Sequence, residues 1–201
     1  RLRWGLLASV CALLLPLATP LSAWLLLPPV VGLLWSARAL LPTGSLQLRR
    51  GLPAIIALRG LIAAAFASLE IYLPLLLQQR HGWTPAAAGA ALAVGALSWS
   101  AGSQIQARWP VGWPVSTLLC GGSGLLGLGV LPLLAVLAGA TPYWSLLAMG
   151  VSGLGIGLVF PRLSVLTLAL SPADSQGEGA SSLQLSDALV TAAVTAIGGV
   201  L

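Results

Sequence analysis

The chain has 201 residues, of which 58% are hydrophobic and only 6% are charged, with a formal net charge of +5. A water-soluble domain carries about 25% charged residues, so this composition excludes an ordinary soluble domain. The basic residues are all arginines, scattered between apolar runs without interleaved stacking aromatics, and we therefore expect no nucleic-acid partner.

Apolar runs long enough to cross a bilayer follow one another along the chain. A spanning helix needs about 20 largely apolar residues, and the runs predict an all-α, polytopic transmembrane helix bundle with about seven membrane segments. In chain order the segments cover residues 4–18, 21–40, 52–77, 85–107, 113–139, 143–170 and 180–201. The first is short, and the pair Pro28-Pro29 should kink or interrupt the second.

Capping residues and aromatics mark the ends of these segments. Thr84-Pro85 and Thr141-Pro142 each place a hydroxyl before a proline, which predicts an N-cap followed by the first helical residue. A serine at position 181 or 182 is expected to cap the last helix. The aromatic residues expected at the membrane interfaces are Trp83, Trp109, Trp113, Tyr143 and Trp144.

The arginines favour one orientation in the membrane. If the N-terminus is cytoplasmic, most loop arginines also fall on the cytoplasmic side, as the positive-inside rule requires. These are Arg1, Arg3, Arg38, Arg49, Arg50 and Arg108. Arg80, in the outer loop 78–84, is the exception. Lysine and asparagine are absent, which fits a GC-rich bacterial coding sequence, so we predict a multi-pass protein of the bacterial inner (plasma) membrane.

Two soluble-enzyme signatures occur in apolar surroundings. The glycines of Gly122-Ser-Gly124-Leu-Leu-Gly127 match a dinucleotide-binding fingerprint, but no strand precedes them and no acid follows at the required distance. We expect them to let helices pack closely instead. One histidine, two cysteines and four acids offer no metal-ligand cluster, so neither a cofactor nor a metal is predicted.

The stretch Gly150-Val-Ser152-Gly153 resembles the serine motif of rhomboid intramembrane proteases. Such a serine needs a general base within hydrogen-bond reach. The single histidine, His81, lies upstream in an expected outer loop, whereas rhomboids carry theirs on a later helix. We therefore expect that the protein is not an enzyme.

Ionisable residues inside apolar helices are the strongest candidates for function, because they are costly in lipid and by default mark a functional pathway. Glu70 lies roughly 10 Å below the outer edge of its segment, where desolvation favours the proton-bound form of the carboxyl. We interpret it as a proton-carrying group; the alternative is a structural hydrogen bond to a neighbouring helix or to Arg59. Asp187 either faces a cavity or only caps or pairs near the interface.

Two arginines and a glycine pair complete the candidates within the helices. Arg162 either snorkels to the headgroups, which we favour, or forms a salt bridge with Asp187. Arg59 is expected to snorkel as well. Gly153 and Gly157 are spaced to form a face at which another helix approaches closely.

Several runs together resemble the C-terminal half of a major facilitator superfamily (MFS) transporter of the drug-efflux type. The runs are Arg59-Gly60, Glu70-Ile-Tyr72-Leu-Pro74, Gly82-Trp-Thr-Pro85, Trp99-Ser-Ala-Gly102-Ser103 with Arg108, Gly153-Leu-Gly155-Ile-Gly157 with Pro161, and Pro172 through Gly179 and Gln184 to Asp187. The resemblance covers residues 51–201. It implies a partial MFS fold in which residues 52–77 correspond to the seventh helix.

The resemblance also implies roles for other residues. Gly102 and Arg108 correspond to a cytoplasmic gate motif, although the Asp-Arg core of that motif is missing here. Tyr72, Arg162 and Gln184 become further cavity or gate candidates. Residues 1–50 would form two membrane segments and a cytoplasmic linker, corresponding to the fifth and sixth helices or to the extra pair of a fourteen-helix member. Residues 51–201 would form the C-terminal bundle without its last helix, so we expect a piece of a longer protein.

Two functions of different classes remain open. The first is a secondary active transporter, with proton-coupled efflux of small amphipathic molecules; its partners would be the lipid bilayer, a small-molecule substrate and protons, with Glu70 as proton carrier and Asp187 as helper. The alternative is a membrane-embedded enzyme or a non-transporting scaffold whose acidic residues are structural.

Overall fold

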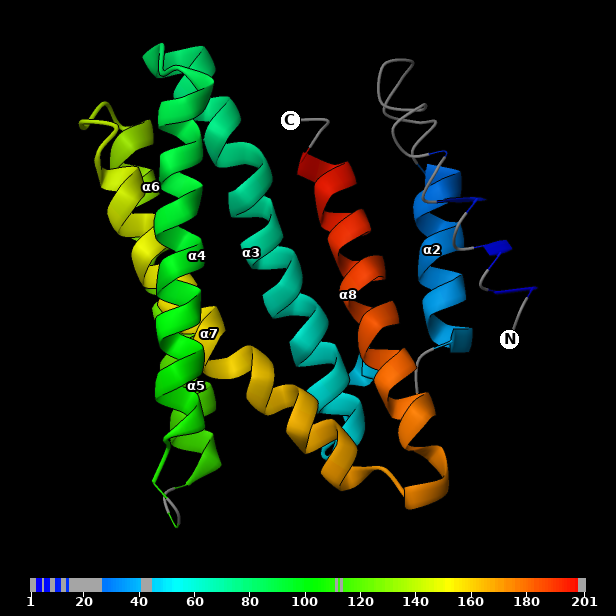
Figure 1. Ribbon diagram of the computed structural model, residues 1–201. Helices are drawn as coiled ribbons and strands as arrows, with labels where there is room; N and C mark the ends of the chain where they lie inside the picture. Colours follow the sequence, from blue (N-terminus) through cyan, green and yellow to red (C-terminus); the bar gives the residue numbers. More distant parts are fainter. Residues whose placement is uncertain are drawn as a thin grey trace. The chain divides into compact units, whose positions relative to one another are not determined.

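The computed structural model describes residues 3–4, 6–7, 10–11, 14, 27–40, 45–110, 112 and 114–198. The longer helices among them are α2 (Leu27–Leu40), α3 (Leu52–His81), α4 (Pro85–Ala107), α5 (Val115–Leu128), α6 (Val130–Leu137), α7 (Trp144–Leu170) and α8 (Gln176–Gly198) (Figure 1). Short 3-10 turns occur at Ser45–Gln47 and Ala173–Ser175. No strand occurs in these parts of the chain, which confirms the predicted all-α class.

Four helical segments are long and apolar enough to cross a membrane. They are α3, α4, the continuous stretch Val115–Leu137 that contains α5 and α6, and α7. They correspond to the predicted segments 52–77, 85–107, 113–139 and 143–170, and they are compatible with a membrane protein. The count of seven is not confirmed: α2 has only 14 residues, α8 is not among the four, and most of 4–18 lies outside the described residues.

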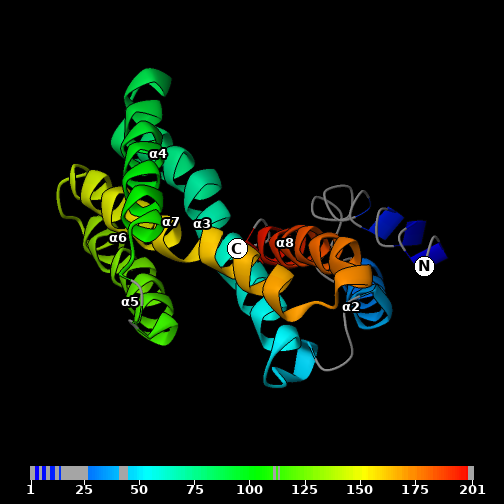
Figure 2. The same ribbon diagram turned by 60° about the horizontal axis from the view of Figure 1, so that its bottom comes forward.

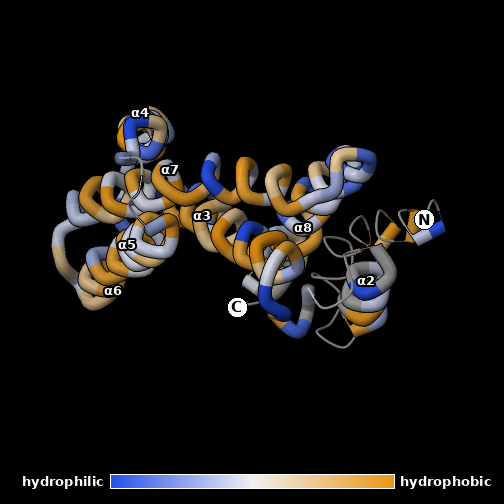
Figure 3. The backbone as a smooth tube through the Cα atoms, turned by 90° about the horizontal axis from the view of Figure 1, so that it is seen from below, coloured by the Kyte–Doolittle hydropathy of each residue, from blue (hydrophilic) through white to orange (hydrophobic). Residues whose placement is uncertain are grey.

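The outward faces of these helices are covered by large apolar side chains. Leu97, in the middle of α4, has 72% of its surface exposed, and Leu131 and Leu134 are exposed on α6. Figure 3 shows hydrophobic residues along most of the length of the helices, with hydrophilic residues in short patches. Large apolar side chains exposed along several helices suit a hydrocarbon solvent better than water.

Helix ends agree with the sequence at α4 and differ at α7 and α8. Thr84 caps α4 as predicted, since its side chain accepts a hydrogen bond from the Ala87 N–H at 3.2 Å. In contrast, α7 begins only at Trp144. The predicted serine cap of the last helix is wrong, because the turn Ala173–Ser175 leads directly into α8 at Gln176.

Proline divides the predicted segment 113–139 into α5 and α6. A regular helix would bond the N–H of residue 132 to the carbonyl of Leu128, but Pro132 has no N–H and its ring crowds that carbonyl. The helix accordingly breaks between Leu128 and Val130. Ser152 of α7 lies fully buried against Gly129 at this break, in surroundings with no room for a substrate.

The chain divides into two compact units, Arg1–Ala64 with Leu163–Leu201 and Ala65–Arg162. Within the second unit, α7 passes close to α4 and to α5 (Figure 2). A Cβ atom on Gly157 would lie 3.0 Å from the Gly102 Cα, and one on Gly155 would lie 2.6 Å from the Gly122 carbonyl oxygen. Gly155 of α7 therefore packs against α5, whereas Gly153 and Gly157 pack against α4. The predicted close-approach face of Gly153 and Gly157 is confirmed.

The same contacts refine the interpretation of the dinucleotide-like glycines. Gly122 packs against α7 as predicted, since a Cβ there would lie 2.9 Å from the Gly155 carbonyl oxygen. The prediction is wrong for Gly124 and Gly127, beside which there is open space. One glycine of the three is therefore required for helix packing.

A hydroxyl compensates for the proline inside α7. Pro161 removes the N–H that would bond the Gly157 carbonyl. The Ser103 hydroxyl of α4 donates a long hydrogen bond of 3.4 Å to this carbonyl. Hydrocarbon would offer this carbonyl no alternative donor. The close contact of α4 with α7 at Gly157 brings the Ser103 hydroxyl within reach, and its hydrogen bond replaces the one that Pro161 removes.

Aromatic contacts join three helices of the second unit. The Trp99 ring of α4 meets Phe66 of α3 edge-on at 5.3 Å and Phe160 of α7 edge-on at 5.6 Å. Edge-to-face pairs of this kind contribute about 0.5–1.5 kcal/mol beyond the area that they bury. Trp99 of α4 therefore contacts both neighbouring helices.

The glycine contacts predict a position-dependent effect of alanine. Gly157→Ala should destabilise the folded protein by about 1–3 kcal/mol, because its methyl group overlaps backbone of α4. The matched substitution Gly124→Ala meets open space and should be neutral or stabilise by up to about 1 kcal/mol through helix propensity. Thermal unfolding midpoints in one detergent compare the two, and equal midpoints would contradict the packing described.

Candidate functional site

In the first unit, α8 approaches α3 closely where α3 carries Gly60. A Cβ atom on Gly60 would lie 2.9 Å from the Ser186 carbonyl oxygen of α8. The Ser186 hydroxyl is buried and donates a 2.9 Å hydrogen bond to the Ile56 carbonyl of α3. Glycine thus supplies the room, and serine supplies a hydrogen bond, for two helices to pack almost backbone to backbone.

This approach brings a cation and an anion together beside it. Arg59 precedes Gly60 and Asp187 follows Ser186, and the Arg59 Nε lies 3.2 Å from Asp187 Oδ2 and 3.3 Å from Oδ1. The Arg59 guanidinium also donates to the Ser164 hydroxyl of α7. The Arg59 and Asp187 side chains are only 8% and 18% exposed. We call Arg59, Asp187 and Ser164 the buried polar cluster.

The buried polar cluster joins three helices at a point where water is scarce. An isolated buried charge is costly, and the Coulomb attraction of the pair together with its hydrogen bonds offsets the desolvation. Removing one partner leaves an uncompensated charge. The cluster is therefore sensitive to any event that neutralises only one of its members, including protonation of the carboxylate.

This geometry corrects the prediction for Arg59 and decides against the alternative salt bridge between Arg162 and Asp187. Arg59 does not snorkel to the membrane surface, because its side chain is buried against Asp187 and Ser164. Asp187 pairs with Arg59 rather than with Arg162, whose buried Nε has no hydrogen-bond partner among the residues that the structure describes. The sequence signal for this pairing was Gly60, next to Arg59. A glycine there permits a neighbouring helix to come within reach of the arginine.

Glu70 lies on the exposed face of α3, in the second unit. No hydrogen bond or ion pair joins its carboxylate to any residue in the described ranges. The alternative that Glu70 is held by a neighbouring helix or by Arg59 is therefore not supported. Its carboxyl stands on an apolar helix with room for a proton or a mobile partner.

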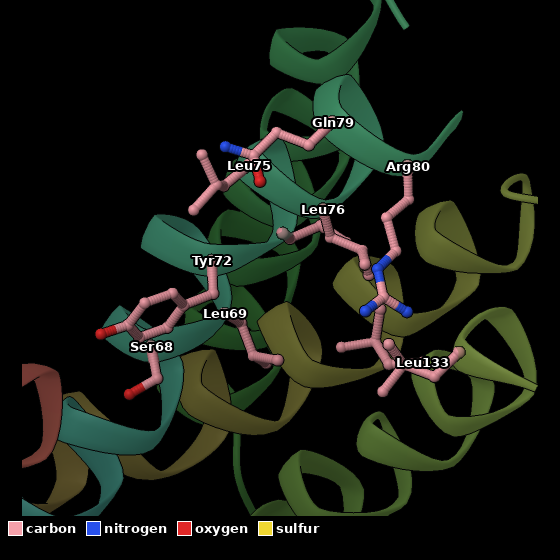
Figure 4. Close-up of a pocket in the computed structure, with 10 residues that line it drawn as sticks. Ser68, Leu69, Tyr72, Leu75, Leu76, Gln79, Arg80 and Leu133 are labelled. Carbon is pink, nitrogen blue, oxygen red and sulfur yellow. The ribbon is translucent and has the colours of Figure 1, made fainter. Parts of the chain in front are cut away.

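Each of the remaining predicted residues is described within its own unit. Gly102 is buried at the contact of α4 with α7, so its role in the structure is packing. Arg108, at the C-terminal end of α4, and Gln184, on α8, are exposed. Tyr72 lines a groove between α3 and α6 (Figure 4).

Comparison with known proteins adds no relative: no protein-family model, no curated protein and no solved structure matches the chain.

The ion pair predicts non-additive effects on stability. Arg59→Gln and Asp187→Asn should each destabilise the protein by about 3–5 kcal/mol, because each leaves the other charge buried alone. The double variant should be less destabilised than the more damaging single variant, because no buried charge remains. Asp174→Asn, at an exposed turn position, is the matched control. Thermal unfolding of all four proteins tests this, and additive losses would contradict a coupled pair.

Proposed function

We propose that the chain is part of a secondary active transporter of the major facilitator superfamily in a bacterial plasma membrane. It would export small amphipathic molecules in exchange for protons. The observation that carries the proposal is the buried polar cluster, because ionisable residues buried between packed apolar helices are functional-site candidates by default. The family resemblance of residues 51–201 is the second support.

In this proposal Glu70 is the proton carrier. Its carboxylate has no described partner, and it stands on a helix that is otherwise apolar enough to cross the membrane. A group of this kind exchanges protons without first breaking an internal salt bridge. Its protonated form is compatible with lipid or an apolar cavity, and its charged form requires water.

Asp187 would couple the proton to helix packing. Protonation of Asp187 would remove the negative charge that holds the Arg59 guanidinium beside α8. The Ser186 hydrogen bond and the Gly60 contact would then be the main attachments of α8 to α3 in this region. Weaker attachment of α8 to α3 would allow these helices to move relative to each other, as alternating access requires.

The alternative function is a membrane-embedded enzyme or a non-transporting scaffold. A scaffold would keep the buried polar cluster permanently paired for stability alone. The two functions differ in the effect of neutral substitutions at the acidic residues. In a transporter they abolish export while the protein stays inserted and folded, whereas an enzyme or a scaffold has no export to lose.

The proposal predicts loss of proton-driven export when Glu70 is neutralised. Cells expressing the full-length protein should accumulate less of a lipophilic cation than control cells, and an uncoupler should abolish the difference. Glu70→Gln should abolish it as well, because the glutamine cannot carry a proton. Glu178→Gln, the same substitution at an exposed position of α8, should not.

Two outcomes would count against this account. Intact export in Glu70→Gln would remove Glu70 from the mechanism. Absence of any uncoupler-sensitive flux across a panel of cationic, neutral and anionic amphiphiles, with membrane insertion verified, would favour the scaffold or enzyme.

A further inference from the structure

A groove of about 300 Å³ lies in the second unit between α3 and α6 (Figure 4). Its walls are mainly leucine, with an arginine at one end and a serine and a tyrosine at the other. The lining residues are Ser68, Leu69, Tyr72, Leu73, Leu75, Leu76, Gln79, Arg80, Leu133 and Leu137. The volume is at the lower end of the range for small-ligand sites, about 300–1,000 Å³.

The groove opens onto the apolar outer surface of the helices. Leu75 and Leu137 in its lining are 48% and 53% exposed, and Leu134 next to them on α6 is exposed as well. The apolar floor is thus continuous with the surface that suits hydrocarbon. A flexible apolar chain, such as a lipid acyl chain, fits a leucine-lined trough of this kind.

Arg80 supplies the positively charged end of the groove. Figure 4 shows its side chain extending from α3 toward Leu133, so that the guanidinium lies over leucine side chains. No hydrogen bond or ion pair joins Arg80 to another residue within the described ranges. The Arg80 side chain is exposed, and its five N–H donors beside the leucines are available to an anion.

The level of Arg80 along the helix matches that of a lipid headgroup. Soon after it, α3 ends at His81, and the Trp83 ring lies beside the Tyr143 ring, tilted by 56°, with centroids 5.6 Å apart. Paired aromatics at helix ends are typical of the membrane interface. Residues 78–81 belong to the last turn of α3, so the predicted outer loop begins only after His81 and Arg80 lies on the helix.

From these observations we propose that the groove binds one anionic phospholipid. Its phosphate would accept hydrogen bonds from the Arg80 guanidinium, whose fork geometry suits phosphate oxygens. One acyl chain would lie over the leucines between α3 and α6. This proposal is independent of proton-coupled transport, since it uses neither Glu70 nor the buried polar cluster.

The test is lipid retention by the purified full-length protein. Delipidated protein in detergent is titrated with phosphatidylglycerol or phosphatidylcholine, and bound lipid is counted by native mass spectrometry. We expect one tightly bound phosphatidylglycerol molecule, and we expect phosphatidylcholine to bind at least tenfold more weakly. Arg80→Gln should weaken phosphatidylglycerol binding about tenfold or more, as the loss of a charge-assisted hydrogen bond implies. Arg108→Gln, which removes an exposed arginine outside the groove, should leave it unchanged.

A second variant separates headgroup from chain. Leu133→Trp fills the groove while keeping Arg80, and it should also weaken retention. This variant decides the matter if Arg80→Gln fails to fold. Equal binding of the two lipids, or unchanged binding in Leu133→Trp, would overturn the proposal. Full displacement of the lipid by millimolar inorganic phosphate would do so too, because it would show an anion site without a chain site.

A photo-reactive residue tests for a different occupant. Benzoylphenylalanine in place of Leu75 should form an adduct with the mass of a phospholipid when the full-length protein is irradiated in membranes. A crosslink to another protein segment instead would show that a helix covers the groove, and it would overturn lipid binding there.

Discussion

Hydrocarbon cannot solvate polar groups, and this constraint explains the main features of the structure. Each helix must satisfy its own backbone, and each break in that pattern needs a partner from a neighbouring helix. The Gly157 carbonyl that Pro161 leaves without a donor receives the Ser103 hydroxyl. The Arg59 and Asp187 charges satisfy each other and Ser164. Close approach at glycines is what places these partners within reach.

The same constraint separates polar groups that are paired within the protein from polar groups that are open to a ligand. Groups that are paired inside a unit, such as Ser186 with the Ile56 carbonyl, hold helices together. The Glu70 carboxylate and the Arg80 guanidinium are exposed and have no partner in the described ranges, so each is accessible to a ligand from outside, such as a proton or a lipid. The proposals for transport and for lipid binding both follow from this distinction, at different residues and with different ligands.

Composition and run length predicted the four helices that are long and apolar enough to span a membrane, because both are local properties of the chain. The α5–α6 break was missed, although Pro132 after Leu128 was the signal. Pairing of Arg59 with Asp187 was not predicted, since it joins residues 128 positions apart and local pattern cannot choose between Arg59 and Arg162 as partner. The start of α8 was misplaced because residues 171–179 are polar yet helical from Gln176 onward, with Glu178 favoured in the first turn.

Solvent accessibility of single cysteines in intact membranes tests most directly whether hydrocarbon surrounds this bundle. In a variant without Cys11 and Cys120, Leu97→Cys, Thr141→Cys and Ala107→Cys are treated with a membrane-impermeant maleimide. The account predicts that Thr141→Cys reacts in intact cells and Ala107→Cys only after permeabilisation. Leu97→Cys should stay unlabelled in both, although its position is 72% exposed in the protein itself. Labelling of Leu97→Cys as fast as Thr141→Cys would show that water faces α4, and would contradict the account.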